Sequence, residues 1–243
     1  QVSREALACT SLAQLGDHGG LFVGLGIDPR SSLSHLRWMM PHRARAWLRE
    51  LGIDAKDSDI EPWISALKDE VSEPLDANRV MGSLGSIAAS RVARDLQAGG
   101  AAHTISADEV SGFRAMEMAI RALQDHQLDV ALAAAADVGL DILTRTLDAR
   151  DRRPPRVDAA VAVVLKRLED VSADDGPVIA TIDGIGSACS GELARPESNS
   201  EARIASRAAA LAEASLDLSG IDLICSDDSS TSVEPLAGRP GWQ

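Results

Sequence analysis

The cysteines and histidines of this sequence are few and widely separated. The cysteines stand at positions 9, 189 and 225, and each of the five histidines is isolated from the others. Neither set has the close spacing of zinc ligands. The adjacent carboxylates Asp227 and Asp228 have no partner at ligand spacing, which indicates a loop. We therefore predict no metal site, and three unpaired cysteines indicate reduced thiols.

A fragment of a dinucleotide-binding pattern occurs at Gly24 and Gly26, but Pro29 stands where that pattern needs its third glycine. The formal net charge of −13 is unlike that of a protein that neutralises phosphates with lysine and arginine. We therefore expect no nucleotide cofactor and no nucleic-acid partner. Such an acidic chain would also repel an acidic partner unless it carried a local basic patch.

Small aliphatic residues dominate the composition. The chain has 243 residues, of which 45% are hydrophobic, with two Phe, four Trp and no Tyr. A core of small side chains suits closely packed helices and strands in a layered α/β protein. The sequence has neither an apolar run of membrane-spanning length nor a signal-peptide pattern. We therefore expect a cytoplasmic protein without a membrane association.

Apolar runs and helical periodicity alternate along the chain. Runs typical of strands lie at residues 21–27, 103–105, 129–138, 161–165, 178–185 and 221–224. Helical patterns cover residues 4–15, 44–51 with Pro41 near a start, 63–67, 80–96, 112–123 and 202–214, and residues 148–157 indicate a loop. In the helix over 112–123 we predict an apolar face of Phe113, Met116, Ala119, Ile120 and Leu123. This alternation predicts helices around a mostly parallel or mixed sheet.

The segment 86–138 has a more specific pattern. A helix rich in small residues leads through Gly100 to a strand that ends at Thr104 and Ile105, and a second helix and an apolar strand follow. This order resembles, without a gap, the central segment of the β-ketoacyl synthases, where the strand ends in a Thr-Val-Asp-Thr-Ala-Cys-Ser-Ser motif. Residues 21–26, 161–168 and 220–231 resemble flanking segments of the same family.

The resemblance implies a thiolase-like layered fold of the α/β class, present as an incomplete copy. Residues 1–243 would form one ketosynthase-like domain, mainly its N-terminal half, with a variable insertion at 31–75 and the start of the C-terminal half at 178–243. The second family histidine and the gating loop would lie outside the chain. The His-Leu-Arg-Trp element at 35–38 is similar to domains of polyunsaturated-fatty-acid and iterative polyketide synthases.

In the register of this resemblance both family catalytic positions that can be aligned are altered. Glu109 stands at the position of the nucleophilic cysteine, and Asp227 at that of the first catalytic histidine. A carboxylate nucleophile would give a labile mixed anhydride in place of a thioester. Asp227 near Glu109 would add repulsion between two carboxylates. It also has no N–H to donate to an enolate, as the family histidine does. At a helix N-terminus Glu109 can also act as a cap, with or without a functional role.

The resemblance leaves several functions open. The first is a chain-length-factor-like partner that forms a homodimer or heterodimer with a ketosynthase through residues 101–106, with Phe113 and Met116 lining or plugging the acyl channel. The second is a malonyl decarboxylase, and the third an active 3-oxoacyl synthase that uses Cys189 or Cys225. Each reading implies an acyl carrier protein as partner and no cofactor beyond the carrier's phosphopantetheine. His103 would be a packed or interface residue, and Cys225 a packing residue.

Overall fold

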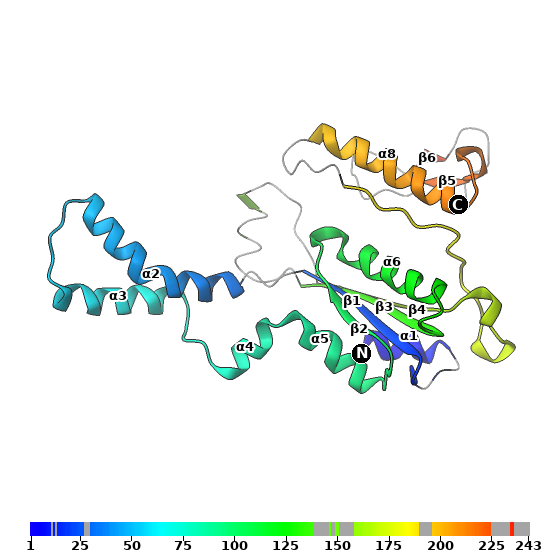
Figure 1. The fold of residues 1–243 in the computed structure, drawn as a ribbon, viewed down its shortest axis with the longest axis horizontal. Coiled ribbons are helices and arrows are strands. Elements are labelled where there is room, and N and C mark those ends of the chain that lie inside the picture. The colour runs from blue at the N-terminus through cyan, green and yellow to red at the C-terminus, as the bar shows by residue number, and fades with distance from the viewer. Residues whose placement is uncertain are drawn as a thin grey trace. The chain divides into compact units, whose positions relative to one another are not determined.

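The computed structural model describes two compact units of the chain, residues 1–177 and residues 178–243 (Figure 1). Within them it describes residues 1–10, 12, 14–26, 30–138, 146, 149–150, 158–189, 196–224 and 234–235. No described helix is both long and apolar enough to cross a membrane.

A four-stranded mixed sheet organises the first unit. Its strands are β1 (Gly19–Leu25), β2 (Ala102–Ile105), β3 (Val130–Asp137) and β4 (Ala159–Leu165). Their order in the sheet is β2-β1-β3-β4. Strand β1 pairs in parallel with β2 and β3, and β4 pairs antiparallel with β3. The α/β class and the four apolar runs that predicted these strands are confirmed.

Helices cover both faces of this sheet. Helix α6 (Ser111–Gln124) lies on one face, while α1 (Val2–Ala8) and α5 (Gly85–Asp95) lie on the other, as Figure 1 shows. The side chains of β1 alternate between two separate cores, because successive residues of a strand point to opposite faces. Leu21 and Val23 pack with α1 and α5, and Phe22 packs with α6.

Strand β3 repeats the alternation with smaller side chains. Its Leu132 belongs to the core on the α1 and α5 face, whereas Ala131 and Ala133 face α6. Helix α6 packs against these residues with alanines of its own, and Ala115 and Ala119 are fully buried. Since two alanine surfaces meet, helix and sheet can approach closely over their whole contact.

An antiparallel pair of helices follows β1 in the sequence. Helix α2 (Arg30–Glu50) packs on α3 (Asp57–Val71) around a small core of Ala44, Ile60 and Ile64. Pro41 lies inside α2 rather than near a helix start, so that part of the sequence prediction was wrong. The helix continues through the proline because its neighbours Met40 and Ala44 are buried, and tertiary packing outweighs the cost of one lost backbone hydrogen bond.

The predicted buried helix over 80–96 was correct only in part. The structure has two helices there, α4 (Ala77–Ser83) and α5, with Leu84 in an extended conformation between them. Only Ala89 and Ala93 of α5 are buried against the sheet, and α4 has no buried residue. The glycines at 82 and 85 weaken helix continuity on either side of the break.

The second unit contains α8 (Pro196–Glu213), a short η4 turn (Leu218–Gly220) and the antiparallel strands β5 (Leu223–Ile224) and β6 (Glu234–Pro235). Residues 178–185, predicted as a strand, are neither helix nor strand. They lie against α8: a side chain at Gly184 would meet the carbonyl oxygen of Ala210 at 2.3 Å. An apolar run forms a strand only beside a strand partner, and here its neighbour is a helix.

Candidate functional site

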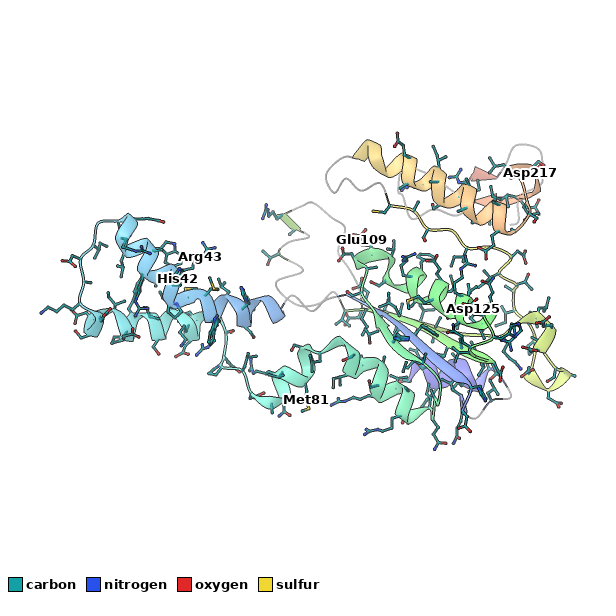
Figure 2. All side chains as sticks on the ribbon, in the orientation of Figure 1. His42, Arg43, Met81, Glu109, Asp125 and Asp217 are labelled. Carbon is teal, nitrogen blue, oxygen red and sulfur yellow. The ribbon has the colours of Figure 1, made fainter. Side chains whose placement is uncertain are left out.

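Glu109 lies where a strand passes into a helix. The 3-10 turn η1 (Asp108–Val110) joins β2 to α6, and Glu109 is its central residue (Figure 2). Because β1, β2 and β3 are parallel, their carboxyl ends meet at one edge of the sheet, and η1 follows directly after that edge. Such an edge is where α/β proteins commonly place ligands.

Glu109 is exposed, and it does not occupy the cap of the helix that follows. Val110 holds the N-cap position of α6 and makes no side-chain capping bond, so Glu109 stands one residue too early to be the predicted cap. Its neighbour Asp108 adopts a φ of 50°, in the left-handed region that aspartate tolerates better than most residues.

The hydroxyl of Ser111 holds this turn together. Its Oγ accepts a hydrogen bond from the backbone N–H of Ala107 at 2.9 Å and donates one to the carbonyl oxygen of Asp108 at 2.6 Å. Ser111 is the buried polar residue at the start of α6, with 5% of its surface exposed. Both bonds cross the position of Glu109 in the sequence and therefore fix the backbone on either side of it.

Two glycines let the first turn of α6 lie directly on the sheet. A Cβ at Gly24 of β1 would lie 2.6 Å from the backbone nitrogen of Gly112 and from the carbonyl carbon of Ser111. A Cβ at Gly112 would lie 2.9 Å from the Cβ of Ala135 in β3. The helix start thus contacts β1 and β3 at distances that only residues without side chains permit.

The other end of α6 is held by Arg167, which follows β4. Its Nη1 donates to the carbonyl oxygens of Leu123 and Leu128 at 2.8 and 2.6 Å, and its Nη2 pairs with Asp129 at 3.1 Å and Asp170 at 2.5 Å. Only 12% of its side chain is exposed. Burial lowers the pKa of Arg167, but the hydrogen bonds and charges of Asp129 and Asp170 outweigh it, so the pKa lies above its ordinary value.

A groove of about 580 Å³ runs between β2 and the outer face of α6. The strand contributes His103 and Ile105, and the helix contributes Arg114, Met118 and Arg121. The ring of His103 lies 5.7 Å from that of Phe22, centre to centre, so the histidine packs on the edge of the α6 core. Strand β2 forms an edge of the sheet in the part of the chain that the structure describes.

The structure locates some predicted site residues and leaves others undescribed. Asp227 and Cys225 lie outside the described residues, as does most of the predicted loop at 148–157. Phe113 was predicted on the apolar face of α6, but 68% of its surface is exposed. Ala115 and Ala122 are buried in its place, because the contact surface of the helix is centred on its alanines. Met116 is partly buried and packs against the core as expected.

Sequence reasoning did not single out Ser111, Gly24 or Arg167 as site-forming residues. The glycine was noted only within an apparent nucleotide fingerprint and a strand segment similar to the family, and the arginine only within a strand-end motif. Close backbone approach and long-range hydrogen bonds leave no periodic signal. Among the residues that the structure describes, no group of three His, Cys, Asp or Glu side chains could hold a metal ion.

Comparison with known proteins bears on this strand–turn–helix arrangement. Residues 50–152 match the sequence model of the family "Beta-ketoacyl synthase, N-terminal domain". The phthioceranic/hydroxyphthioceranic acid synthase of Mycobacterium tuberculosis (strain ATCC 25618 / H37Rv) is 30% identical over 161 residues. That match covers 59% of this chain but 8% of the synthase, so the chain spans a small part of its curated relative.

Solved structures share the fold at low sequence identity. The PfaC keto synthase-chain length factor has a TM-score of 0.59 at 23% identity, covering 84% of this chain and 22% of that one. The ishigamide ketosynthase/chain length factor has a TM-score of 0.55 at 14% identity, covering 89% and 55%. A ketosynthase from module 6 of the bacillaene synthase of Bacillus subtilis 168 has a TM-score of 0.54 at 17% identity, covering 79% and 29%.

The chain thus has the thiolase-like fold of ketosynthases. Its segment 50–152 matches the model of the β-ketoacyl synthase N-terminal domain, in agreement with the resemblance seen in the sequence.

Proposed function

We propose that this chain is a ketosynthase-like domain that does not form carbon–carbon bonds and instead acts as a chain-length-factor-like partner of a competent ketosynthase. The observation that carries the proposal is the place of Glu109, on the turn between β2 and α6. In the register of the family motif this is the position of the nucleophilic cysteine.

The chemistry of a carboxylate at this position argues against elongation. A ketosynthase stores its acyl chain as a thioester, whereas Glu109 would form an anhydride that water cleaves readily. The backbone of the turn is nevertheless held in a defined position by the Ser111 hydrogen bonds and by the close contact at Gly24. A scaffold that is kept around an unsuitable nucleophile fits a partner role better than a catalytic one.

The edge strand β2 supplies a surface for such a partner. The backbone N–H of Leu21 donates to the carbonyl oxygen of Ala101 at 2.8 Å. In a parallel ladder, alternate residues therefore direct their polar groups toward β1, and Ala102 and Thr104 direct theirs outward. A strand of the ketosynthase can add to these groups, while the groove lined by His103 and Arg121 receives its side chains.

Two of the solved structures that share this fold are described as a ketosynthase together with a chain length factor, which supports the proposal. A carrier protein with a phosphopantetheine arm would deliver the acyl chain, and Phe113, exposed near the start of α6, would contact it. The chain itself would need no further cofactor.

The test is co-expression of the full chain with the ketosynthase of its own synthase, followed by size-exclusion chromatography. Ala102→Pro removes an outward N–H without touching the inner ladder, so we expect the complex to weaken about tenfold or more. Ala102→Ser keeps the N–H and should leave it intact. A chain that stays monomeric in every mixture contradicts the proposal.

Activity measurements separate the partner role from catalysis. The full chain alone should condense no malonyl group, and the complex should make products whose length changes when Phe113→Ala is introduced. Release of CO₂ from malonyl carrier protein that is lost in Glu109→Ala would instead establish a decarboxylase. Condensation by the chain alone would establish an active synthase.

A further inference from the structure

Helices α2 and α3 run side by side in opposite directions (Figure 1) and carry opposite charges. With histidine counted as neutral, α2 contains five arginines and one glutamate, a net charge of +4. Helix α3 contains five acidic residues and one lysine, a net charge of −4. Arg37 pairs with Asp69, and Arg45 pairs with Glu61. Each pair removes one charge from either helix, which leaves +2 on α2 and −2 on α3.

The two ion pairs also fix the register of the helices. An advance of eight positions along α2 corresponds to a return of eight positions along α3. Arg43 stands two positions before Arg45. It therefore lies level with Trp63, which stands two positions after Glu61. Asp59 lies about one helical turn from that level.

The helix pair has two flanks, one on each side of its core. Arg45 and Glu61 are joined across one of them, which we call the paired flank. Successive helical residues are about 100° apart, so Arg45 lies about 100° to one side of the buried Ala44 and Trp47 about 60° to the other. On α3, Glu61 and Trp63 likewise lie on opposite sides of the line of buried residues. Trp47 and Trp63 therefore share the second flank, which we call the tryptophan flank.

The tryptophan flank is apolar and only half covered. Trp47 has 40% of its surface exposed, Trp63 has 39%, and Leu36 has 39%. Leu51, in the turn after α2, has 72% exposed and follows Trp47 by four positions, so it lies in the same row. An exposed apolar surface that is edged by charged residues is typical of a protein–protein interface.

Charges of opposite sign stand at the two outer rims of this flank. Arg43 and Glu50 lie on the rim of α2, and Lys56 and Asp59 lie on the rim of α3. All four are exposed, and none of them forms an ion pair with another described residue. By the register of the pair, Glu50 is level with Lys56, and Arg43 is within about one turn of Asp59. Each rim charge thus has its opposite at a similar height on the other rim.

We propose that the tryptophan flank is an interface between two copies of this chain, which form a four-helix bundle with α2 of each copy against α3 of the other. A two-fold axis parallel to the helices keeps every residue at its own height and places each α2 rim on an α3 rim. Arg43 of one copy then meets Asp59 of the second copy, and Glu50 meets Lys56.

Charge selects both the occupant and its orientation. A two-fold axis perpendicular to the helices would set α2 against α2, with like charges opposed. The charges of α2 and α3 cancel, so two copies can approach at this pair although the whole chain has a formal net charge of −13. The surface is separate from β2, to which the ketosynthase partnership was assigned, and the inference does not depend on that partnership.

The first experiment measures the dimer dissociation constant of the full chain by sedimentation velocity. Trp47→Asp is compared with Trp38→Asp, because Trp38 is in the same helix but lies in the row of Arg45 on the paired flank, with 81% of its surface exposed. We expect Trp47→Asp to raise the dissociation constant about tenfold or more, and Trp38→Asp to change it less than about threefold. Far-UV circular dichroism checks that both variants keep their helices.

Charge reversal tests the orientation of the two copies. Arg43→Asp alone, or Asp59→Arg alone, places like charges at two symmetric contacts of the dimer, so each should weaken it about fivefold or more. An equimolar mixture of the two variants restores opposite charges at both contacts, and we expect it to form a heterodimer as tight as the wild-type dimer. Both residues are exposed, so these changes leave the cores untouched.

A wild-type chain that stays monomeric overturns the proposal, as does an equal loss in Trp47→Asp and Trp38→Asp. A mixture of the charge variants that associates no better than either variant alone overturns it too, since α2 would then not face α3 of the second copy. Ala102→Pro should leave this dimer intact, because it acts on β2. A dimer that is lost in Ala102→Pro would place the contact at β2 and exclude the tryptophan flank.

Discussion

The sheet and the α2–α3 helix pair are built on opposite principles. In the sheet, α6 contacts β1 and β3 through glycines and alanines, with backbone atoms in direct contact at Gly24. In the helix pair the core is small, and side-chain charges such as Arg37 and Asp69 join the two helices. Large apolar side chains, Trp38 above all, remain exposed there.

These two kinds of packing suit different tasks. Close backbone packing tolerates little movement and fixes the position of the turn that carries Glu109. A helix pair joined by ion pairs and few buried side chains can vary its outer surface at little cost. One region therefore positions the site, and the other displays a surface. The two have separate cores, so their stabilities can be tested separately.

The largest effect should come from a side chain at Gly24. A Cβ there meets the backbone of Ser111 and Gly112 at 2.6 Å, so Gly24→Val must displace the start of α6. We expect the free energy of unfolding to fall by more than about 4 kcal/mol, measured by urea denaturation. Gly26→Val is the control, because a Cβ at Gly26 has no atom within 4 Å. Equal loss in both variants would contradict the tight contact.

A smaller and more local effect should follow Ile64→Ala in the helix pair. Ile64 is 2% exposed, and its truncation should cost about 2–4 kcal/mol. Because its core shares no residue with the cores of the sheet, hydrogen exchange should rise in residues 30–71 and stay unchanged in β1 and β3. Leu132→Ala, in the sheet, should show the reverse pattern. Exchange that rises in both regions with either variant would mean that they unfold together.

The smallest effect concerns Asp175, which joins the end of β4 to the turn η3 (Ala173–Asp175). The backbone N–H of Ser172, the ammonium of Lys166 at 2.9 Å and the Ser172 hydroxyl lower the pKa of Asp175 from 3.8 to about 2. A pKa below its unfolded value adds stability that is present above pH 3.8 and is lost as the pH falls through about 2.

We therefore expect Asp175→Asn to lower the melting temperature by about 2–4 °C at pH 7 and to match the wild type near pH 2. Asp174→Asn, in the same turn, is the control. A difference between Asp175→Asn and wild type that persists unchanged at pH 2 would show that the charge of Asp175 is not the cause.

Sequence patterns predicted best those helices and strands that have a continuous row of buried side chains. The apolar runs that became β1 and β3 and the periodic helix α6 were predicted because each buries several side chains against a neighbour. Strand β4 was predicted from its apolar run, although none of its residues is fully buried. The run at 178–185 failed because a strand also needs a strand partner, and Ile179 is instead 92% exposed. The prediction at Pro41 was wrong because helix propensity considers a single residue, whereas α2 is stabilised by the packing of many residues.

The candidate site was predictable only through its motif. The register placed Glu109 between a strand and a helix, and the structure has that turn at residues 108–110. The residues that hold it could not be predicted, because Ser111 acts through two short-range hydrogen bonds and Arg167 through carbonyl oxygens some forty positions away. Such bonds depend on three-dimensional proximity and leave no trace in spacing.

Helix α6 is held in place at both of its ends. Gly24 and Gly112 hold its start, and Arg167 holds the carbonyl groups at its finish. None of these contacts involves the side chain of Glu109. This architecture can therefore accept different side chains at the position of Glu109 without rearranging the strand and the helix on either side of it.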